Sequence, residues 1–233
     1  MVNFSYYDTI SNLIPGCIFL WGISFFGPLN TESGILSILT GNDIVDVVLF
    51  LVVAFFVGHI IQFFSKKIVE PMIKKIFWDG HFYSELVLLK PMKKIEPELY
   101  ENVINYAKQD LKISLEKLDL LKDNEVISDE DKRKNAMKIS NLIYRMIDAK
   151  IVETRKETKA QLQNTYYSLF RNFSMCFLAL LSLNIVFFIM GLIPLNPSSI
   201  FNIFFMLILI VIFAIQAKER AELYINGLFW SIR

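Results

Sequence analysis

Residues 44–64 read IVDVVLFLVVAFFVGHIIQFF, and Ser65-Lys66-Lys67 follows directly. An α-helix rises about 1.5 Å per residue, so this stretch is about 31 Å long, close to the roughly 30 Å hydrocarbon core of a bilayer. Three other stretches, at about 10–28, 173–193 and 200–215, are similarly apolar. The sequence therefore predicts four transmembrane helices.

The positive charges of the chain occupy two regions. All 24 lysines and arginines lie between Lys66 and Arg171 or from Lys218 onwards, and none lies in residues 1–65 or 172–217. Segments rich in Lys and Arg stay on the cytoplasmic side of a membrane. Four crossings then leave both termini in the cytoplasm. The 54% hydrophobic content excludes an ordinary soluble domain.

We therefore predict an all-α protein with four parts. A transmembrane hairpin occupies residues 1–64, and a helical cytoplasmic domain at 65–172 is inserted between the second and third crossings. A second hairpin occupies residues 173–215, and an amphipathic cytoplasmic tail occupies 216–233. The tail carries aromatic residues that suit a membrane–water boundary, namely Tyr224, Phe229 and Trp230.

Proline and glycine positions predict the form of two helices. Pro15-Gly16 and Gly22 predict that the first helix is short or kinked. No proline or glycine occurs between Asp129 and Met190. We expect one long helix there, which joins the cytoplasmic domain to the third crossing.

Polar residues inside the apolar stretches are candidates for pore or helix-interface positions. His59 and Gln62 lie near the cytoplasmic end of the second crossing, and Asp46 lies at its outer end. Asn184 lies in the middle of the third crossing. Polar groups at such depths face other helices or a water-filled cavity. Helix packing is the alternative for each, and Asp46 could instead complement a helix N-terminus.

The same polar residues predict assembly. His59, Gln62 and Asn184, together with Ser174 and Ser182, exceed what a simple anchor requires. In a monomer some of them would face lipid without a hydrogen-bond partner. We expect a closed homo-oligomer of about four subunits. Asn184 or His59 would then lie at a subunit interface or along the pore.

Lysines cluster directly after the second crossing. Contact with lipid headgroups is the first interpretation, because juxtamembrane lysines commonly bind anionic lipids. A site for a nucleotide or another anionic ligand is the second, because the aromatic residues Phe77 and Trp78 lie close by in the sequence. The residues concerned are Lys66, Lys67, Lys74 and Lys75, with Lys90, Lys93 and Lys94 further along the chain.

No catalytic or metal-binding pattern is visible. The chain has no GxSxG, HExxH or Walker motif. His81 has no Cys or second His near it, and Cys17 and Cys176 both lie in apolar stretches. We expect no enzymatic activity, no cofactor, no metal ion and no stable binding of DNA.

Four segments carry a resemblance to small inner-membrane proteins of bacteria: YYDTISNLIPGCIFLWG, VGHIIQFFSK, FRNFSMCFLAL and KERAELYINGLFWSI. Four crossings around a helical cytoplasmic domain also resemble the membrane effectors of anti-phage defence, including the Hailong, CBASS and Pycsar classes and the membrane partner of Kiwa. The resemblance implies a protein of the bacterial inner membrane that perturbs the membrane when a cytoplasmic signal arrives.

The leading hypothesis is therefore a ligand-gated channel or membrane-disrupting effector of anti-phage defence. Its signal would be a nucleotide, an oligonucleotide or a soluble defence protein. The alternative is a membrane sensor or scaffold that recruits a soluble defence partner. Membrane lipids are expected partners in both cases.

Overall fold

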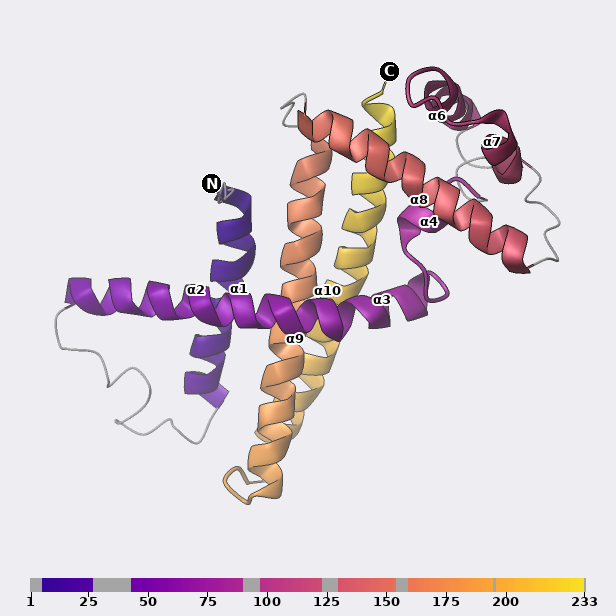
Figure 1. Ribbon diagram of the computed structural model, residues 1–233. Helices are drawn as coiled ribbons and strands as arrows, with labels where there is room; N and C mark the ends of the chain where they lie inside the picture. Colours follow the sequence, from indigo (N-terminus) through magenta and orange to yellow (C-terminus); the bar gives the residue numbers. More distant parts are fainter. Residues whose placement is uncertain are drawn as a thin grey trace. The chain divides into compact units, whose positions relative to one another are not determined.

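A computed structural model describes residues 6–26, 43–89, 97–122, 130–153, 159–194 and 196–232. Every regular element in these ranges is an α-helix (Figure 1), so the predicted all-α class is confirmed. The helices are α1 (Tyr6–Phe26), α2 (Asp43–Lys67), α3 (Val69–Phe77), α4 (Tyr83–Leu86), α6 (Pro97–Gln109), α7 (Leu115–Lys122), α8 (Glu130–Glu153), α9 (Lys159–Ile189) and α10 (Pro197–Trp230).

Three of the described helices are long and apolar enough to cross a membrane. They occupy Ile44–Phe77, which joins α2 to α3, Gln161–Ile189 in α9, and Pro197–Trp230, which is α10. The apolar part of α1, Thr9–Ser24, is shorter. The membrane character predicted from the sequence is therefore supported for three helices, and the fourth crossing stays a prediction.

The chain divides into two compact units. The first unit comprises Met1–Met72 and Thr165–Glu219, and the second comprises Ile73–Asn164 and Arg220–Arg233. The helices α3, α9 and α10 each contribute residues to both units. The domain limits predicted from the sequence stay predictions.

In the first unit, α1 runs beside α9 in the same direction. Three contacts rise along both helices together. Asn172 Nδ2 lies 3.0 Å from the Ser11 carbonyl oxygen, and Cys176 Sγ lies 3.6 Å from the Pro15 carbonyl oxygen. Further along both helices, Gly22 packs against the Leu180 side chain, which lies where a Cβ on the glycine would be.

The helices α9 and α10 form an antiparallel hairpin with a tight connection. Gly191 adopts a φ of +71°, and the amides of Gly191 and Leu192 donate to the carbonyls of Phe188 and Phe187, which is the Schellman arrangement of a helix end. The Asn196 side chain then caps α10 by accepting the Ser199 amide at 2.8 Å. Pro197 occupies the first helical position, where no amide donor is needed.

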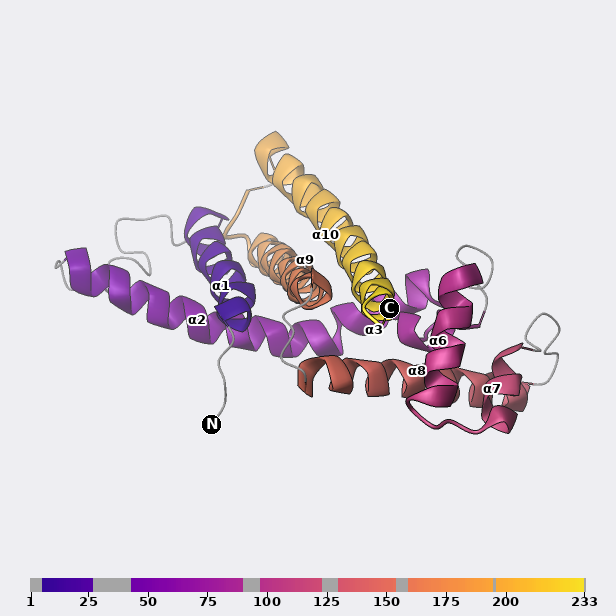
Figure 2. The same ribbon diagram turned by 90° about the horizontal axis from the view of Figure 1, so that it is seen from above.

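The helix α2 crosses α1 instead of lying beside it (Figures 1 and 2). The two backbones touch at glycines: a Cβ on Gly16 would lie 1.8 Å from the Ala54 carbonyl oxygen. A Cβ on Gly58 would lie 2.0 Å from the Asn12 carbonyl oxygen. A larger residue at either position would push the helices apart, so this crossing depends on glycine.

The second unit has a hydrophobic core built from α4, α6, α7, α8 and the C-terminal part of α10. Val103, Ile143 and Leu228 are among its fully buried members. The tail aromatics that the sequence placed at a membrane boundary belong largely to this core: Tyr224 is 8% exposed and Phe229 is fully buried. The apolar face of the tail therefore packs against protein.

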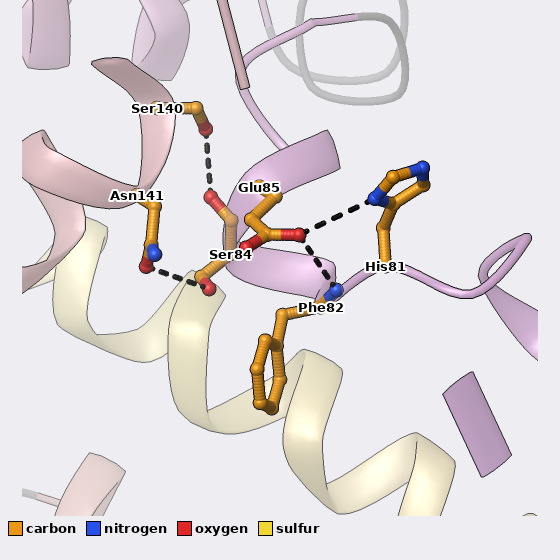
Figure 3. A network of polar contacts seen from close by, with 6 residues as sticks. All are labelled: His81, Phe82, Ser84, Glu85, Ser140 and Asn141. Carbon is orange, nitrogen blue, oxygen red and sulfur yellow. Dashed lines mark hydrogen bonds and ion pairs between the residues drawn. The ribbon is translucent and has the colours of Figure 1, made fainter. Parts of the chain in front are cut away.

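Polar contacts fix the tail and α4 in the second unit. The Tyr224 hydroxyl donates to Asp148 Oδ1 at 2.8 Å, and the Trp78 indole donates to Glu222 Oε1 at 3.1 Å. Figure 3 shows a further network, in which the Ser140 hydroxyl donates to the Ser84 carbonyl at 2.7 Å. These hydrogen bonds satisfy polar groups that the core would otherwise leave unpaired.

The predicted long helix between Asp129 and Met190 falls partly outside the described residues. The structure describes α8 and α9 within this range, and residues 154–158 between them lie outside the description. Continuity across those five positions stays a prediction. The proline in α1 does not end that helix, which continues from Tyr6 to Phe26.

Candidate functional site

The most polar point of the first unit is centred on Arg171 in α9. Its side chain is almost completely buried, and it is the last cation before the apolar stretch that begins at Phe173. Its Nη1 donates to Glu70 Oε2 at 2.6 Å, and its Nε donates to the Ser65 hydroxyl at 3.0 Å. The guanidinium also lies 5.0 Å from the centre of the Tyr167 ring. Arg171 thus joins α9 to α2 and α3.

Asn172, the next residue, joins α9 to α1. Pro15 has no amide hydrogen, so the carbonyl of Ser11, four residues earlier, loses its helical hydrogen bond. Asn172 Nδ2 donates to that carbonyl at 3.0 Å and lies 3.4 Å from Asn12 Oδ1. The buried asparagine therefore compensates for the proline in α1.

We call these six residues the polar layer: Ser11, Asn12, Ser65, Glu70, Arg171 and Asn172. On α9 the layer separates a polar segment, 159–170, from the apolar segment 173–189. On α1 it lies beside the crossing with α2, because Asn12 is in backbone contact with Gly58. The layer therefore lies just before the apolar segment of α9 and in the N-terminal part of the apolar segment of α1.

The electrostatics of the layer make it sensitive to change. A buried guanidinium is tolerated when it is paired, and loss of one partner leaves an uncompensated charge. Arg171 Nη2 and Asn172 Oδ1 have no hydrogen-bond partner among the residues that the structure describes. The layer is thus incompletely satisfied as it stands, and Glu70 is the only carboxylate recorded against Arg171 in the described ranges.

Metal binding has no support in the described parts of the chain. Within them, no three His, Cys, Asp or Glu side chains gather closely enough to hold a metal ion. His81 Nδ1 lies 3.5 Å from Glu85 Oε2, and Glu85 also accepts the Phe82 amide (Figure 3). This pair belongs to the start of α4 in the second unit.

The polar residues predicted on α2 are not members of the layer. His59 is half-buried, and its ring meets the Phe55 ring edge-on at 4.5 Å between centroids. Gln62 and Asp46 are also half-buried. Among the described residues, Asn184 forms no hydrogen bond with any of these three, and their pore or interface roles stay predictions.

The polar residues predicted on α9 have partners within the chain. Asn184 Nδ2 donates to the Leu180 carbonyl at 3.0 Å, and the Ser182 hydroxyl donates to the Leu178 carbonyl at 2.8 Å. Both bonds lie within α9. The Ser174 hydroxyl donates to the Ile210 carbonyl of α10 at 3.0 Å. These groups therefore do not require a second subunit for satisfaction, and the homo-oligomer stays a prediction.

The predicted lysine cluster is partly described. Lys66, Lys67 and Lys75 are exposed, and Lys67 Nζ lies 4.4 Å from the centre of the Phe63 ring. Lys74 Nζ lies 3.0 Å from the centre of the Phe82 ring. The predicted contributions of Lys90, Lys93 and Lys94 lie outside the described residues.

Sequence reasoning missed the layer, although two signals pointed to it. Arg171 is the last cation before a long cation-free stretch. Pro15 inside an apolar helix demands a donor for the Ser11 carbonyl, and Asn172 is a suitable donor. Neither signal identifies its partner, because the pairing of α9 with α1 and α3 cannot be read from one sequence.

Comparisons with protein-family models, curated proteins and solved structures gave no match.

Proposed function

We propose that the protein is an effector embedded in the bacterial inner membrane, which raises the permeability of that membrane when its second unit receives a cytoplasmic signal. The observation that carries the proposal is the ion pair between the buried Arg171 and the partly buried Glu70. This pair holds α2, a helix apolar enough to cross a membrane, across α1 and α9.

The helix α3 offers a short path from the second unit to this ion pair. Glu70 belongs to the first unit, whereas Ile73, less than one turn further on, is buried and belongs to the second. Trp78 follows and is bonded to Glu222 of the second unit. A movement of the second unit would therefore pull the carboxylate away from Arg171.

Release of Glu70 frees α2 to turn about its contact with α1. The glycine contact at Gly16 and Gly58 is a single crossing point, which allows α2 to swing until it lies beside α1. Two discrete arrangements of packed helices are the usual basis of such transitions. The swing inserts the apolar helix α2 into the bilayer. This insertion is the step that raises the permeability of the membrane.

The released state has the four crossings that the sequence predicts. The hairpin of α9 and α10 crosses in both states, with Asn196 on the outer side and Ser231 in the cytoplasm. All lysines and arginines then lie on the cytoplasmic side, which agrees with the positive-inside rule. Labelling of cysteines introduced at these two positions tests the orientation of the hairpin.

The helix α10 provides a second connection between the units. It is one helix of 34 residues, and Ile210 bonds to α9 in the first unit while Leu228 lies in the core of the second. A continuous helix transmits a displacement along its axis. The second unit is therefore tied to the hairpin as well as to α3.

The resemblance to anti-phage effectors supplies the biological setting. The signal in this proposal is a nucleotide, an oligonucleotide or a soluble defence protein that reaches the second unit. Several copies, about four, assemble around an axis in the released state. No catalytic step is required of the chain.

Dye release from liposomes tests the proposal. The full chain is reconstituted with a self-quenched dye, and lysate from phage-infected cells is added as the probe. Glu70→Gln removes the charge that holds Arg171, so we expect this variant to release dye without lysate. Glu98→Gln is the matched control, because Glu98 is exposed on α6.

Two results would contradict the proposal. The first is liposomes that stay sealed for the wild type with lysate and for Glu70→Gln without it. The second is equal release by Glu70→Gln and Glu98→Gln. Planar-bilayer conductance then separates discrete channels from general disruption.

The alternative, a membrane scaffold for a soluble partner, is favoured by one feature. The second unit has its own core, and it exposes the large apolar side chains Leu115 and Leu142. A scaffold would bind the product of a neighbouring gene and leave liposomes sealed. Co-purification with that product, combined with the dye assay, decides between the two functions.

A further inference from the structure

The helix α3 and the end of α2 carry a surface that fits an anionic lipid bilayer. We propose that residues 66–76 lie against the cytoplasmic headgroup region, with the apolar strip Ile68, Met72 and Ile76 among the outer acyl groups and the lysines at the phosphates. The inference rests on the membrane location in the proposed function. It does not depend on gating.

The first observation is an exposed apolar strip. Ile68, Met72 and Ile76 follow one another at four-residue spacing and are 39%, 46% and 67% exposed. Residues with this spacing are neighbours on a helix surface. The adjacent side of the same helix, about 100° around the axis, is buried through Val69 and Ile73. The helix thus has one apolar side against protein and a second one without protein cover in the described residues.

The second observation is charge. Between Ser65 and Phe77 the sequence has four lysines and one acidic residue, Glu70. Glu70 is bound to the buried Arg171. Lys66, Lys67 and Lys75 form no ion pair within the ranges that the structure describes. These three lysines therefore place an uncompensated positive charge beside the strip.

The third observation is continuity with a membrane-length helix. Residues Ile44–Phe77 form a helical run of 34 residues, about 51 Å long, whereas the hydrocarbon core is about 30 Å thick. If this run stood upright in the bilayer, Ile76 would lie about 15 Å beyond Lys66, in water. A local irregularity at Ile68, between α2 and α3, gives the helix a place to bend toward the surface.

The combination identifies the partner by its chemistry. An exposed apolar strip beside lysines is the pattern of a helix that lies in a membrane interface, where lysine stems extend toward phosphates. A soluble nucleotide would use the lysines and leave Ile68, Met72 and Ile76 in water. The apolar strip therefore favours a phospholipid surface over a free anion.

A spin label at position 76 tests the proposal. Ile76→Cys is introduced into the full chain with Cys17 and Cys176 replaced by Ser, and labelled protein is reconstituted with phosphatidylethanolamine and phosphatidylglycerol or with phosphatidylcholine alone. We expect the label to be several-fold more accessible to oxygen than to a water-soluble nickel complex in the anionic vesicles. We expect a lower ratio in phosphatidylcholine.

Lysine variants provide the second part of the test, in which the ratio of oxygen to nickel accessibility at position 76 is measured again. The triple change Lys66→Gln, Lys67→Gln and Lys75→Gln should lower that ratio several-fold in anionic vesicles, whereas Lys117→Gln, Lys132→Gln and Lys138→Gln, at exposed sites of α7 and α8, should leave it unchanged. A label that is water-accessible in both lipid mixtures overturns the proposal. Protection of the label by adenosine triphosphate alone also overturns it, because the surface would then be an anion site.

Two further controls keep the result interpretable. Where the cysteine-free background fails to fold, retention of phosphatidylglycerol by the lysine variants in native mass spectrometry gives the same comparison on the natural cysteines. If the liposomes stay sealed in the dye assay but the label lies in the membrane, the proposed function is rejected and the lipid-binding surface at residues 66–76 is retained. If the liposomes leak but the label is exposed to water, the proposed function is retained and the lipid-binding surface is rejected.

Discussion

The α9–α10 hairpin and the α1–α2 pair are built on the same apolar composition but differ in what fixes them. The hairpin has a Schellman end at Gly191, a cap at Asn196 and aromatic contacts between Phe177 and Phe213 with centroids 5.7 Å apart. The α1–α2 pair meets at one glycine crossing, and many apolar side chains of α2 are exposed. Apolar length alone therefore does not fix the direction of a helix; the contacts at its ends do.

Contacts of the polar layer fix the orientation of α2 relative to α1 and α9. The helix α2 is anchored to α1 through Gly58 and to α9 through Ser65, near the Arg171–Glu70 pair. The hairpin needs no such anchor, because its short turn brings its two helices together. Changes in the layer should therefore affect α2 and spare the hairpin.

The largest effect is expected at the ion pair. Arg171→Gln leaves the Glu70 carboxylate without its buried partner, and breaking such a pair costs about 3–5 kcal/mol. We expect the free energy of unfolding to fall by an amount near the lower end of this range, because Glu70 is partly exposed. Thermal unfolding in detergent measures the change. Arg145→Gln, at an exposed site on α8, should change stability by less than about 0.5 kcal/mol. Equal effects would show that the pair does not hold α2.

The glycine crossing comes next. A Cβ on Gly16 would meet the Ala54 carbonyl, which is backbone and cannot give way, so Gly16→Ala should cost about 2–3 kcal/mol. Gly22→Ala is the matched control, since its Cβ would meet only the flexible Leu180 side chain. Unfolding curves of the two variants should separate clearly. If they coincide, the backbones of α1 and α2 are not in contact.

Because Asn172 compensates for Pro15, the effects of substitutions at these two residues on stability should not be additive. Asn172→Ala leaves the Ser11 carbonyl unpaired, at a cost of about 1–3 kcal/mol. Pro15→Ala restores an amide for that carbonyl, so the loss on removing Asn172 should be smaller in the Pro15→Ala background. A double-mutant cycle measures this coupling. Strict additivity would mean that Asn172 serves another purpose.

The smallest effect is expected in the hairpin turn. Asn196→Ala removes the cap of α10 and should cost about 1 kcal/mol. Ser198→Ala, an exposed neighbour, should be close to neutral. Unfolding in detergent compares the two variants, and neither should alter dye release. A leak caused by Asn196→Ala would assign gating to the hairpin instead of to α2.

The sequence predicts the apolar helices well because their signals are local. Length and hydropathy locate Ile44–Phe64, and Pro197 after Asn196 marks the start of α10. The partners of Arg171 and Asn172 could not be predicted, since they lie more than 100 residues away in the chain. The burial of Tyr224 and Phe229 in the protein core could not be predicted from the sequence either, because an apolar face can pack against lipid or against a protein core.

The distance between α2 and α9 tests the central claim most directly. Spin labels at Val48, ten residues from the contact at Gly58, and at Ile185, near the end of α9, are measured by double electron–electron resonance in liposomes. We expect one longer distance in the wild type, and in Glu70→Gln a population shortened by on the order of 15 Å as α2 swings beside α1. The same single distance in the wild type and in Glu70→Gln would contradict the claim that the Arg171–Glu70 pair holds α2 across the membrane helices.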